Sequence, residues 1–146
     1  MRMSKKPDFN KIKSFVQEQV GEQDLLIRTQ GHGFKVNDYV VQPIEDGWQV
    51  LDNLGFIKQQ FFSRKYAVLS AVLLSKKNNG AVNNLKYLDN QMEIASQDQH
   101  LYNRLLKKET EGTLESIYIA RLSRAKQILE SVRQQIQSIE KSLQLQ

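Results

Sequence analysis

The sequence predicts an α+β fold, and three stretches carry that prediction. Short apolar runs separated by glycine-containing turns lie between residues 24 and 62. An almost uninterrupted apolar run follows at residues 66–74, and heptad-spaced apolar residues continue from residue 85 to residue 143. Short runs of this kind indicate strands, and heptad spacing indicates packed helices. We expect an N-terminal helix, a three- to four-stranded antiparallel meander, a buried central helix and a long antiparallel, coiled-coil-like helical hairpin.

The first helix is expected to begin at Pro7-Asp8 and to end near Gly21, because glycine often follows a helix C-terminus. Its apolar residues recur at helical spacing: Phe9, Ile12, Phe15, Val16 and Val20. An amphipathic helix can bind a membrane surface or a partner, but more often it covers one face of the protein's own core. We favour the second interpretation.

Four strand-like runs follow, and turns separate them. The turns contain Gly31-His32-Gly33, Glu45-Asp46-Gly47 and Asp52-Asn53-Leu54-Gly55. Such short connections join antiparallel neighbours, so the runs predict a meander. The expected strands are Asp24–Thr29, Phe34–Gln42, Trp48–Leu51 and Phe56–Phe62.

The central helix follows directly. Ser63 lies where an N-cap is needed, and residues 66–74 are apolar except for Ser70. A helix that is apolar nearly all round is buried on more than one side. Lys76 and Lys77 are expected in its last turn, where the helix dipole favours cations, and Asn78-Asn79-Gly80 is expected to end it.

The remaining residues predict two long helices joined near Gly112, with Thr113 as a possible cap of the second. Each helix has a heptad seam of apolar residues, which favours an antiparallel hairpin. The first seam is Leu85, Leu88, Met92, Ala95, Gln99, Tyr102 and Leu106, widened by Tyr87, Ile94, Leu101 and Leu105; the second is Leu122, Ala125, Leu129, Val132, Ile136, Ile139 and Leu143.

We therefore divide the chain into an α+β globular domain, residues 1–80, and a helical hairpin packed on it, residues 81–146. The wide apolar face of the first long helix needs a further neighbour. The central helix is one candidate, and a second copy of the chain is the other. The candidate oligomer seam is Leu122, Leu129, Val132, Ile136 and Ile139.

Composition limits the function. The 146 residues contain no cysteine, carry a net charge of +5 and are 40% hydrophobic. Absence of cysteine excludes disulfides and thiol catalysis and fits a reducing compartment. The N-terminus has no apolar run typical of a secretory signal, and no stretch is long enough to cross a membrane. We expect a cytoplasmic protein without a membrane partner.

No group of residues predicts catalysis. His32 and His100 have no second histidine or cysteine at ligand spacing, so we expect no metal. Glu45 and Asp46 lie in a turn, and the glycine loop lacks the Lys-Ser/Thr of a phosphate-binding loop. We expect neither an enzyme nor a cofactor or small-molecule substrate.

The best local candidate for a binding site is the start of the central helix. Ser63, Arg64 and Lys65 combine a hydroxyl, two cations and free backbone N–H groups, which suit an anion. Lys58 and Lys35 lie on strands whose apolar residues occupy both faces, so a basic sheet surface could add nucleic-acid contacts. Alternatively, Arg64 and Lys65 are solvated, and the predicted N-terminal helix covers the basic face of the sheet.

Residues 47–67 also carry a resemblance. Gly47-Trp48-Gln49-Val50, then Gly55, then Phe62 followed by Ser63-Arg64-Lys65-Tyr66-Ala67 resembles a hairpin–helix pattern of small, mostly uncharacterised bacterial and phage proteins with coiled helices after it. The resemblance implies a hairpin leading into a helix and no particular activity. Our leading hypothesis is a non-catalytic protein–protein interaction or assembly subunit, expected to be a homo-oligomer; the alternative is a nucleic-acid-binding module.

Overall fold

The computed structural model describes residues 27–30, 33–108 and 112–144. The predicted first helix, residues 7–21, lies outside these ranges. In chain order, the described elements are β1 (Ile27–Gln30), β2 (Gly33–Val36), β3 (Tyr39–Ile44), β4 (Gly47–Leu51), β5 (Ile57–Phe61), α2 (Arg64–Ser75), α3 (Asn79–Leu106) and α4 (Thr113–Gln144).

The strands form one antiparallel sheet in the order β1-β2-β3-β4-β5, which confirms the predicted meander topology but has one strand more than the three or four expected. The range Phe34–Gln42, expected as one strand, divides into β2 and β3. Asn37 turns the chain there with a φ of 53°, a left-handed conformation that asparagine tolerates. Because Val36 pairs with Tyr39, the turn contains two residues, the tightest common hairpin.

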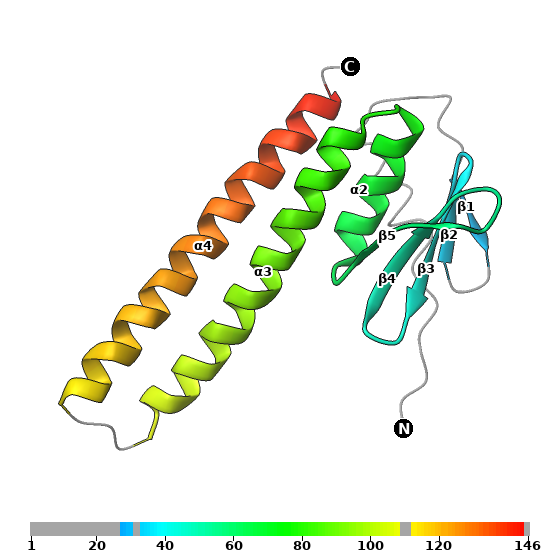
Figure 1. Cartoon of the computed structure of the whole chain (residues 1–146). Coiled ribbons are helices and arrows are strands. Elements are labelled where there is room, and N and C mark those ends of the chain that lie inside the picture. The colour runs from blue at the N-terminus through cyan, green and yellow to red at the C-terminus, as the bar shows by residue number, and fades with distance from the viewer. Residues whose placement is uncertain (1–26, 31–32, 109–111, 145–146) are drawn as a thin grey trace.

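The two faces of the sheet differ. Phe34, Val41 and Val50 share a register row and are fully buried, because α2 packs against them. The three described helices lie on this side of the sheet, with α2 between the sheet and the long helices (Figure 1). The opposite face is therefore covered by none of them.

The predicted central helix is α2, and it is buried all round. Every residue from Tyr66 to Leu74 is buried, Ser70 included. The predicted end is wrong, because the helix stops at Ser75 and the next one begins at Asn79, capped by Asn78.

The two predicted last-turn lysines therefore lie beyond the helix. Lys76 is its C-cap, and Lys77 follows with a φ of 59°. The N–H of Lys77 donates to the carbonyl of Leu74 at 2.9 Å, and the N–H of Asn78 donates to that of Leu73 at 2.9 Å. This is the hydrogen-bond pattern of a Schellman motif, with lysine where glycine is usual.

The long helices α3 and α4 lie side by side and run in opposite directions (Figure 1). Near their connection, the ring centroids of Tyr102 and Tyr118 are 5.7 Å apart. At the other end, Leu85 and Leu88 of α3 and Val132 of α4 belong to the same buried cluster as the sheet and α2. One core thus crosses the boundary at residue 80 that we drew from the sequence.

Lys77 provides a test of the α2 terminus. We expect Lys77→Gly to raise the free energy of unfolding by about 0.5–1 kcal/mol, because glycine adopts a left-handed φ without the Cβ clash. Lys76→Gly is the matched control. Its φ of −92° suits any residue, so glycine there only loosens the unfolded chain and should lower the free energy of unfolding. Urea unfolding measures both; a Lys77→Gly variant less stable than the parent would contradict the expectation.

Ser70 provides a second test. Its Oγ is buried and has no hydrogen-bond partner in the described part of the chain. Removing an unsatisfied buried hydroxyl should be favourable, so we expect Ser70→Ala to raise the melting temperature and stabilise the fold by about 1–2 kcal/mol. In the control, Ser75→Ala, a 3.0 Å hydrogen bond to the Ala71 carbonyl is lost, and we expect no gain. Thermal and urea unfolding compare the two; equal effects would contradict the prediction.

Candidate functional site

The start of α2, the candidate site of the sequence, is built around a carboxylate from α3. Ser63 is the N-cap, and its Oγ accepts the Tyr66 N–H at 3.4 Å. The buried Asp89 carboxylate accepts the N–H of Phe62 at 2.7 Å and the N–H of Ser63 at 3.2 Å. The backbone donors just before this helix therefore already bind an anion, and that anion is part of the same chain.

The two cations at the helix start also have partners within the chain. The Arg64 guanidinium lies over the Trp48 ring, 5.9 Å from its centroid. The Lys65 Nζ lies 3.1 Å from an oxygen of Glu140, near the end of α4. Cations at a helix start oppose the helix dipole, and these contacts offset that effect.

Burial changes the titration of two groups here. Burial raises the pKa of Tyr66 to about 12, and the negative charges of Asp89 and Glu140 add to the effect. Burial also raises the pKa of Asp89, while the N–H groups of Phe62 and Ser63 and the charge of Lys86 oppose that rise. The Tyr66 hydroxyl stays protonated at neutral pH, so it cannot act as a base.

Beside this junction is a cavity of about 340 Å³ between α2, α3 and α4. Polar side chains at its rim include Lys65 and Glu140. Its apolar wall is Met92, Leu129, Val132 and Ile136.

Much of the predicted oligomer seam is therefore used inside the chain. Val132 and Ile136 are buried in the common core, and Ile139 packs against it. Leu129 lines the cavity, and Leu122, nearer the start of α4, is partly buried. Val132 and Ile136 offer no exposed surface to a second copy.

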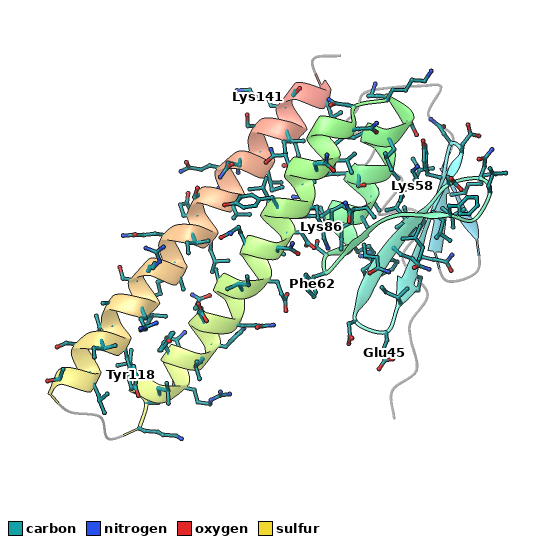
Figure 2. The ribbon with its side chains drawn as sticks, in the orientation of Figure 1. Glu45, Lys58, Phe62, Lys86, Tyr118 and Lys141 are labelled. Carbon is teal, nitrogen blue, oxygen red and sulfur yellow. The ribbon has the colours of Figure 1, made fainter. Side chains whose placement is uncertain are left out.

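A second groove, of about 380 Å³, lies between the turn that joins β3 to β4, the end of β5 and α3. Figure 2 shows Lys86 and Phe62 where α3 meets the end of that strand. The Lys86 Nζ donates to the Gln60 carbonyl at 2.5 Å and lies 5.7 Å from the ring centroids of Phe61 and Phe62. The ammonium thus covers part of a strand edge, a common protection against unwanted strand pairing.

The sequence did not indicate this role of Lys86. Its hydrogen-bond partner is 26 positions away in the chain. Its only local signal was a lysine beside the apolar residues of a predicted seam.

The five predicted anion-binding residues do not form one surface. Lys35 is on β2 in the register row of Val40, on the sheet face opposite α2, and Lys58 is exposed on β5. Arg64 and Lys65 lie on the helix side of the sheet. On the same strand as Lys58, Phe61 is buried and Ile57 is exposed.

No family model, curated protein or solved structure matches the chain. The resemblance of residues 47–67 to small bacterial and phage proteins stays a prediction. The described residues contain no group of three or more acidic or histidine side chains that could hold a metal ion. None of α2, α3 and α4 combines the length and apolar character that crossing a membrane requires.

Asp89 can be tested by an isosteric change. In Asp89→Asn one acceptor oxygen becomes an NH2 donor, so one of the two backbone N–H groups loses its partner. We expect this change to destabilise the fold by about 1–3 kcal/mol. Asp98→Asn is the control on the same helix, where we expect a change within about 0.5 kcal/mol. Urea unfolding provides both values, and equal effects of the two substitutions would remove the assigned role.

Proposed function

We propose that this chain is a non-catalytic protein–protein interaction or assembly subunit that self-associates through the far end of its helical hairpin. We call this end, residues 96–106 and 113–124, the distal hairpin. The observation that carries the proposal is a group of large apolar side chains exposed there. They are Leu114, Ile117 and Ile119, with exposed fractions from 40% to 54%.

The distal hairpin has no third layer. It extends past α2 and the sheet, with Tyr118 at its far end (Figure 2). No residue of its described ranges is buried, although each helix supplies several large apolar side chains. Two helices alone bury little surface, and bundles of four are a common stable solution.

The α3 helix carries further exposed apolar side chains nearer the core. Tyr87 and Ile94 are 59% and 57% exposed and are one heptad apart, so they lie on the same side of the helix. Leu101, one heptad farther, is partly buried. A second hairpin lying against this side would cover the stripe, and the heptad spacing suits coiled-coil-like packing.

The internal contacts of the cations favour this role over the nucleic-acid alternative. Arg64 and Lys65 are held by Trp48 and Glu140, so phosphate binding would compete with existing contacts. The lack of cysteine fits a reducing compartment, and we place the subunit in the cytoplasm.

Light scattering after size exclusion tests self-association. We expect the parent to have at least twice the monomer mass at about 100 µM, an ordinary range for weak self-association. Leu114→Ser, Ile117→Ser and Ile119→Ser together should weaken association by at least about 100-fold, since each half-exposed side chain contributes about 1 kcal/mol on burial and both copies lose them.

The control replaces three apolar residues of the sheet region that are more exposed still, as Leu54→Ser, Phe56→Ser and Ile57→Ser. This variant should keep the parent mass. A monomeric parent would refute self-association, and dissociation caused by the control alone would place the interface on the sheet. Far-ultraviolet circular dichroism confirms that each variant is folded.

A further inference from the structure

The cavity between α2, α3 and α4 has the size and the lining of a small-molecule site. Its volume of about 340 Å³ lies within the range of ligand pockets, which are mostly apolar and hold a few placed polar groups. The apolar lining joins Met92 of α3 to Leu129, Val132 and Ile136 of α4. Protein interiors are otherwise closely packed, so a hollow of this size leaves apolar contacts that a ligand would make.

The cavity is long and follows the axis of α4. Its lining on that helix runs from Leu129 to Glu140, a distance of about 16 Å. At the Glu140 end, the Lys65 Nζ lies 3.1 Å from the carboxylate, so an ion pair joins α2 to α4 there. The α3 helix lies between α2 and α4 (Figure 1) and supplies Met92 to the lining. A hollow of this form suits an extended apolar chain better than a compact ring system.

The charges of the lining favour a ligand with an anionic head group. Two cations, Lys65 and Arg133, and one carboxylate, Glu140, line the cavity. Because Lys65 and Glu140 neutralise each other, the charge that is left over belongs to Arg133. This residue lies two helical turns from the ion pair, about 10 Å along α4. An anion at Arg133 and an apolar chain directed toward the ion pair would therefore match the lining.

The partner that Arg133 has within the chain is weakly held. The Arg133 Nε donates to the Glu130 carboxylate at 3.1 Å, and Glu130 is not one of the lining residues. The two side chains are 57% and 50% exposed, and exposed ion pairs of this kind contribute little to stability. A ligand carboxylate can replace Glu130 at small cost, because a guanidinium binds any carboxylate through the same two parallel N–H groups.

We propose that this cavity binds a small amphipathic carboxylate with a medium-length alkyl chain. The head group pairs with Arg133, and the chain lies against Leu129, Val132 and Ile136. No residue of the distal hairpin lines the cavity, so this ligand site is separate from the surface of self-association. Local sequence patterns do not indicate such a site, since its lining comes from three helices.

Titration calorimetry with decanoate tests the site on the full chain. We expect the parent to bind with a Kd below about 1 mM, an ordinary affinity for so small a ligand. Arg133→Gln removes the head-group partner and should weaken binding at least about tenfold. Glu130→Gln removes the competing carboxylate and should strengthen binding about twofold. Lys126→Gln is the matched control: Lys126 is exposed on α4 outside the lining, so the same loss of charge should leave the Kd within about twofold.

Two further variants locate the alkyl chain. Leu129→Trp fills the apolar part of the cavity and should abolish binding, and circular dichroism checks that this variant is folded. Leu114→Ser, Ile117→Ser and Ile119→Ser together change the distal hairpin and should leave the affinity for decanoate unchanged.

Four results would overturn the proposal. They are a parent that binds no decanoate at several millimolar, an Arg133→Gln variant with the affinity of the parent, a folded Leu129→Trp variant that still binds, and loss of binding in the distal-hairpin variant. The readout is affinity for a small molecule and not the mass of the protein, so this proposal can fail while self-association stands.

Discussion

The buried carboxylate of Asp89 is the contact on which the placement of the sheet and the helices depends. Apolar packing is not directional, and α2 is apolar on all sides, so packing alone would allow several rotations of this helix. Asp89 removes that freedom, because its oxygens accept the N–H groups of both Phe62 and Ser63. A carboxylate buried without such donors would be strongly unfavourable, so the contact also requires α3 to stay where it is.

The same contact explains why the start of α2 resembles an anion site in the sequence. Free N–H groups, a hydroxyl and two cations are the features that bind phosphate. In the structure the N–H groups of Phe62 and Ser63 bind the Asp89 carboxylate of α3, and Lys65 pairs with Glu140 of α4. The Ser63 hydroxyl caps the helix, and Arg64 lies over the Trp48 ring. Cations at a helix start depart from the usual preference of a helix N-terminus. Here that departure reflects tertiary structure, since the carboxylates near this end belong to the hairpin. The hairpin is therefore joined to the sheet by polar contacts as well as by a shared core.

Local patterns predicted the parts of the fold that depend on local physics. The all-apolar run of α2, the meander and the two seams follow from periodicity and turn residues. The Asn37-Asp38 turn was missed because the flanking residues alternate like one strand. The contacts of Asp89 and Lys86 could not be predicted, because each joins residues 26 or 27 positions apart and their chemistry looks like that of any solvated helix charge. The position of Lys77 beyond the helix end depended on a cap geometry that lysine rarely adopts.

The exposed apolar side chains of the distal hairpin are the surface that the internal contacts of the described residues leave uncovered. The distal hairpin lies at the end of the long helices that is away from α2 (Figure 1). A partner for it must come from solution and must overcome the loss of translational freedom, which requires more buried apolar surface. The hairpin supplies that surface on two helices, with Tyr87 and Ile94 extending it along α3. The contacts of Asp89 and Lys86 hold the near end of the hairpin on the sheet, so the internal contacts and the proposed association use opposite ends of the long helices.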